Sequence, residues 1–280
     1  MITYLPTITK LENNDPKTYN FFLNQSYGCY GDFNLFDLAL PKNKETTSLF
    51  FYIHGGGWSA YDKENAAFYN AINYNDGIAY GGMNYRYIGP HVNCEDILDE
   101  ITLCLKKIKE LSEHKGVKIN KVAFYGHSAG AHLSMLYAYK RRNECPFEIA
   151  FVVSYSGVFD FTDPILYAQK AHVSEYKYWF SLLSGKKLNF EKIHEFNQEL
   201  LDISPINYVK NACPTIIAHG EFDDTFPFGL TKRFIEKLSN QKKTFEIIEY
   251  VNCGHNLEHD LKANERVENL IYFYKSKYLK

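Results

Sequence analysis

The chain has 280 residues, of which 45% are hydrophobic and 23% are charged, so it can bury the core of one large domain or of two small ones. Its formal net charge of -2 offers no electrostatic attraction to nucleic acid or to an anionic membrane, and we expect a small molecule as its partner. The six cysteines are scattered without a C-x-x-C pair, which argues against a zinc ribbon, a thioredoxin-type site and a disulfide scaffold.

The N-terminal segment shows no basic stretch leading into an apolar one, and the sequence has no run of about 18 apolar residues. We therefore expect a cytoplasmic protein that is not inserted in a membrane. Residues 33–40 alternate between apolar and polar side chains and are predicted to form an antiparallel edge strand. Short apolar runs predict buried strands at residues 48–53, 77–85, 121–125, 149–155, 215–219 and 245–251.

Amphipathic segments alternate with these strands, which predicts an α/β fold with a mostly parallel sheet and helices on both faces. Helices are predicted at residues 96–111, 131–139 and 227–238. The last of them is expected to hold Pro227 in its first turn. Residues 160–208 show no strand pattern but many aromatic side chains, and we interpret them as a lid inserted into a single domain that spans residues 1–280.

The pattern G-x-S-x-G occurs between a predicted strand and a predicted helix, at Gly126-His127-Ser128-Ala129-Gly130. Strand, tight turn and helix are the context of a nucleophile elbow, in which a strained turn lifts the serine hydroxyl above the edge of the sheet. Glycine and alanine suit the flanking positions because the turn leaves room only for small neighbours. Ser128 is therefore the predicted nucleophile, and His127 is treated as a variable position of the motif.

A glycine-rich loop follows the first predicted buried strand, with the sequence His54-Gly55-Gly56-Gly57-Trp58. Unhindered amides in such a loop can turn toward the negatively charged oxygen of a tetrahedral intermediate. We predict the amides of Gly56, Gly57 and Ala129 as the oxyanion-hole donors. The loop lacks the terminal Gly-Lys-Ser/Thr that a phosphate-binding P-loop requires.

An acid and a base are expected after two later strands, because a serine hydroxyl is a poor nucleophile until a base takes its proton. Asp223 and Asp224 both follow the predicted strand at residues 215–219. We predict Asp223 as the acid and keep Asp224 as the alternative, since one of two adjacent carboxylates can instead cap the next helix. His255 follows the last predicted strand and is the predicted base.

A competing pattern overlaps the predicted base, because H-x-x-E-H is matched by His255-Asn256-Leu257-Glu258-His259. Two histidines four residues apart on a helix can bind zinc, which makes a metallohydrolase the competing hypothesis. That hypothesis leaves the elbow and the glycine loop unexplained and offers no obvious third ligand. We therefore predict no metal, and we assign no catalytic role to His54, His127 or His219.

Together these motifs resemble the α/β-hydrolase superfamily, in which the triad follows the order serine, acid, histidine. The resemblance covers nearly the whole chain from about residue 30, and it includes the further runs Asn84-Tyr85-Arg86-Tyr87, Ser156-Gly157-Val158-Phe159-Asp160 and Ser204-Pro205. Within the superfamily the chain is similar to the feruloyl/acetyl esterases, to the hormone-sensitive-lipase-like esterases and to the kynurenine formamidases. Trp58 and His127 point to the first and the last of these groups.

The resemblance implies a serine carboxylesterase that needs no metal or organic cofactor and cleaves small acyl esters, acetyl esters first, through an acyl-enzyme. A formamidase that acts on an N-formyl aromatic amide, or a carbohydrate or feruloyl deacylase, would share every catalytic residue and remains an alternative. A non-catalytic binding protein on this fold would normally have lost a triad residue. We predict Trp58 and Trp179 as walls of the substrate pocket. The sequence predicts no particular oligomeric state.

Overall fold

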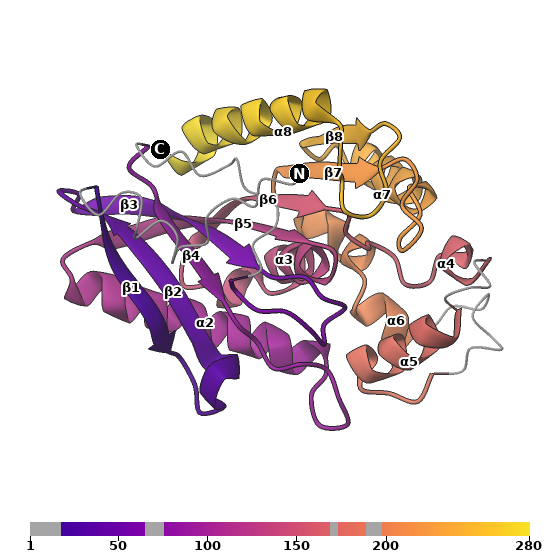
Figure 1. Ribbon diagram of the computed structural model, residues 1–280, viewed down its shortest axis with the longest axis horizontal. Helices are drawn as coiled ribbons and strands as arrows, with labels where there is room; N and C mark the ends of the chain where they lie inside the picture. The colour runs from indigo at the N-terminus through magenta and orange to yellow at the C-terminus, as the bar shows by residue number, and fades with distance from the viewer. Residues whose placement is uncertain (1–17, 65–75, 169–172, 189–197) are drawn as a thin grey trace.

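The computed structural model describes residues 18–64, 76–168, 173–188 and 198–280. They form an eight-stranded sheet in the order β1-β2-β4-β3-β5-β6-β7-β8 (Figure 1). The strands are β1 (Tyr19–Ser26), β2 (Leu35–Pro41), β3 (Thr46–Ile53), β4 (Ala79–Met83), β5 (Lys118–His127), β6 (Glu148–Tyr155), β7 (Thr215–Gly220) and β8 (Phe245–Tyr250). The pairs β1–β2 and β2–β4 are antiparallel, and all other neighbours are parallel.

The mostly parallel sheet that the sequence predicts is confirmed. Each of the buried strands from β3 to β8 forms where an apolar run predicts it, with ends that differ by at most three residues. The side chains of β3, β4, β6 and β7 are nearly all buried, because helices cover both faces of the sheet, whereas β8 at the edge keeps part of its side chains in contact with solvent.

The predicted antiparallel strand at residues 33–40 is present as β2, but it does not lie at the edge of the sheet. β1 pairs with it on the outer side, where Phe21 lies opposite Ala39. The strand begins at Leu35, because residues 31–34 form the 3-10 helix η1 (Gly31–Asn34). Most side chains of β1 are partly or fully exposed, so no continuous apolar pattern marks this strand in the sequence.

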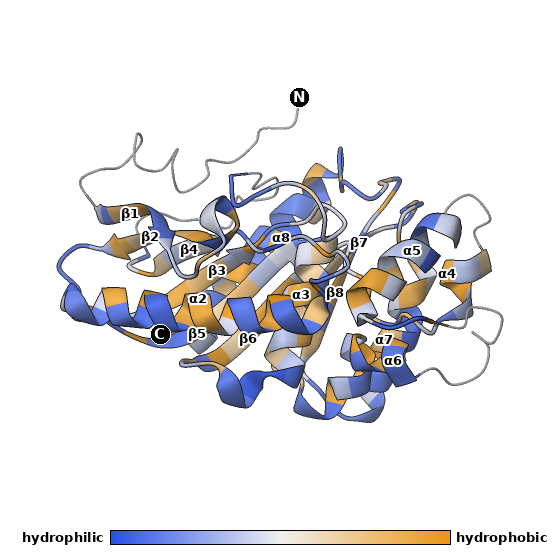
Figure 2. Cartoon of the chain, turned by 90° about the horizontal axis from the view of Figure 1, so that it is seen from below, coloured by the Kyte–Doolittle hydropathy of each residue, from blue (hydrophilic) through white to orange (hydrophobic). Residues whose placement is uncertain are grey.

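Helices cover both faces of the sheet, as predicted, and Figure 2 shows their apolar residues alternating with polar ones. The apolar side chains of α2 (Cys94–His114), α3 (Ala129–Lys140) and α7 (Gly229–Asn240) join one core cluster, on one face of the sheet. The other face is covered by α8 (Leu261–Tyr274), whose buried side chains join a second cluster. The sequence predicts Pro227 in the first turn of α7, but the helix begins two residues after it, at Gly229.

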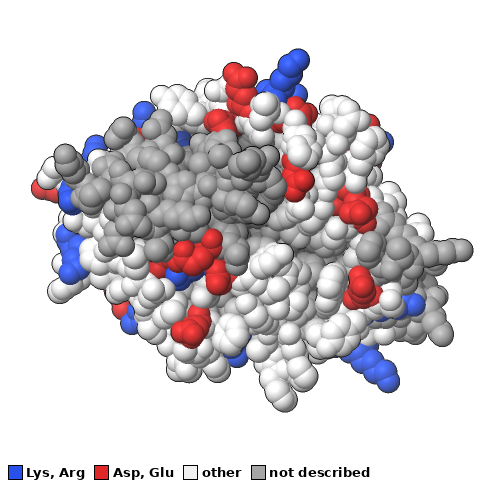
Figure 3. Space-filling view, viewed as in Figure 1, with Lys and Arg blue, Asp and Glu red and all other residues white. Residues whose placement is uncertain are grey.

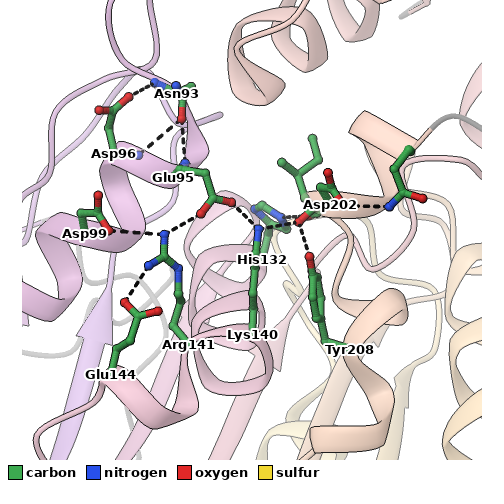
Figure 4. Close-up of polar contacts among 12 residues, drawn as sticks. Asn93, Glu95, Asp96, Asp99, His132, Lys140, Arg141, Glu144, Asp202 and Tyr208 are labelled. Atoms are coloured by element: carbon green, nitrogen blue, oxygen red, sulfur yellow. Dashed lines mark hydrogen bonds and ion pairs between the residues drawn. The ribbon is translucent and has the colours of Figure 1, made fainter.

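Helix α3, which follows the predicted nucleophile, is fixed at its C-terminal end by charged side chains (Figure 4). Lys140 and Arg141 both pair with Glu95 of α2, the second of them over 2.6 Å. Lys140 also donates to the carbonyl oxygen of Asp202 over 3.1 Å. The helix is buried along its length, and these contacts join its C-terminal end to α2 and to α6.

The described parts of the predicted lid at residues 160–208 consist of short helices joined by turns, without a strand. Its elements are α4 (Pro164–Ala168), α5 (Val173–Ser184), α6 (Gln198–Asp202) and the 3-10 helix η4 (Pro205–Asn211). Phe180 of α5 packs edge-on against Phe161 within this segment, with the ring centroids 4.7 Å apart, and Phe161 in turn contacts Trp58 of the core cluster. Residues 169–172 and 189–197 of the predicted lid lie outside the described residues.

Short helical turns complete the described fold, namely η2 (Arg142–Glu144) and the π-helical turn η5 (Lys275–Leu279). All six cysteines are free thiols. Within the described ranges, no helix is both long enough and apolar enough to cross a bilayer.

Candidate active site

Ser128 occupies the tight turn between β5 and α3, at the carboxyl end of the parallel strands. Its backbone has φ 54° and ψ −121°, a conformation that L-residues rarely adopt and that stores strain. A Cβ atom on Gly126 would lie 2.7 Å from the carbonyl oxygen of Ile53, and one on Gly130 would lie 2.1 Å from the same atom, so both positions require glycine. The strand, turn and helix that define a nucleophile elbow are therefore present around Ser128.

The glycine loop after β3 lies directly against this turn, since a Cβ atom on Gly55 would be only 2.8 Å from the carbonyl oxygen of His127. Gly56 and Gly57 have left-handed backbones, with φ of 99° and 58°. In the described part of the chain, the amides of Gly56, Gly57 and Ala129 donate to no acceptor. The amides predicted as oxyanion-hole donors thus belong to two segments that contact each other, the glycine loop and the turn at Ser128. Each of these amides is available to donate a hydrogen bond to a ligand.

Residues 84–88, which follow β4, hold the glycine loop and the residues after it through ring stacking and hydrogen bonds. The ring of Tyr85 stacks on the imidazole of His54 with centroids 4.0 Å apart, and its hydroxyl donates to the His54 carbonyl over 2.9 Å. Further contacts of this segment are those of the Lys63 amide with Asn84 Oδ1 (2.8 Å), the Tyr87 hydroxyl with the Tyr61 carbonyl (2.6 Å) and the Ile88 amide with the Trp58 carbonyl (3.0 Å). The run at residues 84–87 entered the sequence-based resemblance, but nothing in it indicated this role.

Asp223 and His255 meet beyond the ends of β7 and β8. Nδ1 of His255 donates to Oδ2 of Asp223 over 2.8 Å, whereas the adjacent Asp224 is exposed. The geometry therefore favours Asp223 over its alternative as the partner of the histidine. In the described part of the chain, no hydrogen bond joins the hydroxyl of Ser128 to the ring of His255. That contact of the predicted triad stays a prediction.

The carboxylate of Asp223 is buried and accepts three hydrogen bonds, from the amides of Thr225 (2.9 Å) and Phe226 (2.7 Å) at Oδ1 and from Nδ1 of His255 (2.8 Å) at Oδ2. Nε2 of His219 lies 3.2 Å from Oδ2 and donates to the carbonyl oxygen of Phe226 over 2.6 Å. Burial alone would raise the pKa of Asp223, but the two adjacent imidazoles hold it well below its ordinary value. Asp223 is therefore ionised at neutral pH, and the buried His219 both adjoins this carboxylate and binds the turn that follows it through the carbonyl of Phe226.

The two tryptophans predicted as pocket walls lie in different surroundings. Trp58 is fully buried in the core cluster, and its indole N–H donates to Nδ1 of His132 over 3.1 Å. Trp179 of α5 is only partly buried, and a Cβ atom on Gly57 would lie 3.8 Å from its ring. Trp179 is thus beside the glycine loop, whereas Trp58 anchors that loop in the core. Contact of either ring with substrate stays a prediction.

The sequence pattern H-x-x-E-H does not form the helix that a zinc site of this kind needs. Residues 255–259 form a turn followed by irregular backbone, and His259 has a left-handed backbone with φ 80°. Its side chain is 82% exposed, while His255 is engaged with Asp223. Across the described ranges, no group of three or more His, Cys, Asp or Glu side chains is arranged to hold a metal ion. This geometry gives the metallohydrolase hypothesis no support.

Comparisons with known proteins agree with this fold. Residues 36–238 match the BD-FAE family. A truncated carbohydrate esterase from gut microbiota superposes with a TM-score of 0.72 at 16% identity, and the match covers 94% of this chain and 98% of that one. Esterase B from Lactobacillus Rhamnosis gives 0.72 at 20% identity, covering 95% and 89%. A bacterial heroin esterase gives 0.71 at 16%, covering 94% and 84%. At these identities the solved structures show a shared fold.

Proposed function

The chain belongs to the BD-FAE family of α/β-hydrolase esterases, and from this premise we propose that it hydrolyses small, short-chain acyl esters, acetyl esters first, through an acyl-enzyme. One observation carries the proposal. The strained turn at Ser128, the open amides of the glycine loop and the ionised Asp223 paired with His255 all lie at the carboxyl ends of neighbouring parallel strands.

The proposed reaction begins when the Ser128 hydroxyl attacks the ester carbonyl carbon while Nε2 of His255 accepts the hydroxyl proton. The carbonyl oxygen becomes an oxyanion, which the amides of Gly56, Gly57 and Ala129 stabilise. The intermediate then collapses, the ester C–O bond breaks, and His255 returns the proton to the departing alcohol. Water, deprotonated by His255, finally attacks the acyl-enzyme and releases the carboxylic acid, which restores the serine.

Asp223 contributes to this sequence through its charge and its geometry. Because Oδ2 accepts from Nδ1 of His255, that nitrogen carries the proton and Nε2 is left as the base. An imidazolium formed during the reaction is stabilised by the carboxylate, whose pKa is held low by its own donors. The pair is therefore suited to cycle one proton at neutral pH.

A small and neutral substrate suits the surroundings of this site. Trp179 beside Gly57 limits the space over the oxyanion loop, which favours short acyl groups. The face shown in Figure 3 carries acidic and basic side chains in scattered groups. The described part of this face therefore carries no large patch of one sign that would steer a highly charged ligand toward the protein.

Rates on p-nitrophenyl acetate, butyrate and octanoate, on an acetylated sugar and on N-formylkynurenine test the proposal. We expect the acetate to be cleaved fastest among the chain lengths, and Ser128→Ala to lose at least about 1000-fold in kcat. Ser134→Ala is the matched control, because Ser134 is a buried serine of α3, the helix that follows Ser128. Activity that survives Ser128→Ala but is lost in chelator would contradict the proposal. Faster turnover of N-formylkynurenine than of every ester would show that the substrate is a formamide and not an ester.

A further inference from the structure

The backbone carbonyl of His255 accepts two side-chain hydrogen bonds from residues that the reaction does not use. Nε2 of His127 lies 2.9 Å from this oxygen, and the hydroxyl of Ser156 donates to it over 2.8 Å. A carbonyl oxygen has two lone pairs and can accept both donors at once. Since a carbonyl can only accept, the ring of His127 must carry its proton on Nε2.

The two donors come from the ends of two neighbouring parallel strands. His127 is the last residue of β5 and precedes the predicted nucleophile, while Ser156 directly follows β6. The next strand, β7, leads to Asp223, which holds the imidazole of the same histidine. The segment that carries His255 is thus attached to three consecutive strands, twice through its carbonyl oxygen and once through its ring.

Both donors lie in surroundings that constrain them, Ser156 through its backbone conformation and His127 through its protonation state. Ser156 is fully buried and has a left-handed backbone with φ 49°, which a non-glycine residue adopts only when its surroundings impose it. Burial, together with the neighbouring His255, lowers the pKa of His127 to about 3, so this ring stays neutral while the base gains a proton. Its ring centroid lies 4.9 Å from that of His255, and a second positive charge there would oppose the formation of an imidazolium.

We propose that His127 and Ser156 are positioning residues that together hold the carbonyl of His255 and thereby aim its imidazole at the nucleophile, a role that rests on the proposed serine esterase function. With two donors on one oxygen, either alone still restrains the backbone of residue 255. Removal of both leaves the imidazole attached only through its side chain to Asp223. The loss should therefore appear in kcat, which depends on the alignment of the base, and much less in KM.

Amide variants of His127 separate hydrogen bonding from simple packing. The side-chain nitrogen of glutamine reaches about as far as Nε2 of histidine, whereas that of asparagine is too short to reach the carbonyl. We expect His127→Gln to retain most of the wild-type kcat on p-nitrophenyl acetate, and His127→Asn to lose roughly threefold with KM within about twofold. A glutamine variant as slow as the asparagine variant would overturn the role of the hydrogen bond.

Ser156→Ala should cost roughly threefold in kcat, and its matched control is Ser154→Ala, because Ser154 is a buried serine of β6 whose hydroxyl has no hydrogen-bond partner in the described part of the chain. The variant with both His127→Asn and Ser156→Ala should lose about thirtyfold or more, which exceeds the product of the single losses. A double variant no slower than that product would show that the donors act independently and would overturn the shared restraint.

Hydrogen exchange tests the restraint without reference to activity. In the double variant the amides of residues 252–258 should exchange several-fold faster than in the wild type, while those of α8 should not change. Unchanged exchange at residues 252–258 would overturn the proposal, even if turnover is lost. If the wild type cleaves no ester, the proposed function fails, and the exchange rates still decide whether the two donors restrain residue 255.

Discussion

The indole N–H of Trp58 donates to Nδ1 of His132 over 3.1 Å, and this contact decides which nitrogen of the buried imidazole carries the proton. Because Nδ1 accepts, Nε2 holds the hydrogen and donates to the carbonyl oxygen of Ile203 over 2.7 Å. Figure 4 shows His132 reaching across from α3 toward the segment after α6. A neutral histidine thus joins the glycine loop, the helix that follows Ser128 and the segment directly after α6.

Trp58→Phe should lower the free energy of unfolding by about 2–4 kcal/mol, because it leaves Nδ1 of His132 buried without its donor and removes part of a fully buried ring. Denaturation in urea measures this loss. Trp179→Phe is the matched control, since Trp179 is only partly buried, and its effect should be clearly smaller. Equal losses in the two variants would contradict the structural importance of the Trp58 contact.

Stability should fall as the pH is lowered from 7 to 5. Burial lowers the pKa of His54 and that of His132 to about 4, whereas histidine in an unfolded chain titrates near 6.5. Below pH 6.5 the unfolded chain therefore binds protons that the folded chain does not, and the free energy of unfolding decreases until the pH reaches the folded pKa. Each of these histidines should account for a loss of about 2 kcal/mol between pH 7 and pH 5.

Urea denaturation at both pH values checks this dependence, and the exposed His91 provides its control. His91→Gln should leave the pH dependence unchanged, while His132→Gln should make it shallower. The carboxylate of Asp223 does not interfere, because its lowered pKa keeps it ionised at pH 5. Stability that is equal at pH 7 and pH 5 would show that these imidazoles are not held neutral.

Tyr85→Phe should reduce kcat by roughly tenfold and leave KM within about twofold, because the hydroxyl that holds the His54 carbonyl is lost and the proposed oxyanion donors lose alignment. Steady-state kinetics on p-nitrophenyl acetate measure both constants. Tyr139→Phe is matched to it, since Tyr139 is also fully buried and hydrogen-bonded, but to Thr215. If both variants lose kcat alike, the effect belongs to general stability and not to the oxyanion loop.

Asp223→Asn should reduce kcat by about 1000-fold or more, because the amide cannot stabilise an imidazolium and favours the wrong tautomer of His255. The adjacent Asp224→Asn serves as its control and should change kcat by less than about threefold, since Asp224 is exposed. Measured rates on one ester distinguish the two carboxylates. A larger loss at Asp224 would reverse the assignment of the acid.

Trp179→Ala should shift the chain-length optimum toward longer acyl groups, because removal of the indole opens space beside Gly57. The ratio of kcat/KM for p-nitrophenyl octanoate to that for the acetate should rise by about tenfold. Tyr178→Ala, on the exposed side of the same helix, should leave this ratio unchanged. An unaltered ratio in Trp179→Ala would show that Trp179 does not contact the acyl group of the substrate.

The strands from β3 to β8 were predictable because each contains a local run of apolar residues, which is typical of a buried strand. β1 was not predicted, because its partly exposed side chains form no such run. Without β1, the strand β2 was predicted to lie at the edge of the sheet. The start of α7 was misplaced by two residues because Pro227 is tolerated equally well just outside a helix and in its first turn.

The sequence by itself determined the fold class and the candidate nucleophile, acid and base. These depend on short-range requirements, such as the small residues around Ser128, that are visible within a few positions. Only the tertiary structure decided what surrounds them. His127 reaches a carbonyl 128 residues away, Ser156 reaches the same atom across 99 residues, and Trp58 finds its partner across 74. A hydrogen bond requires two groups within about 3 Å at a suitable angle, and that condition is met only after the strands have aligned.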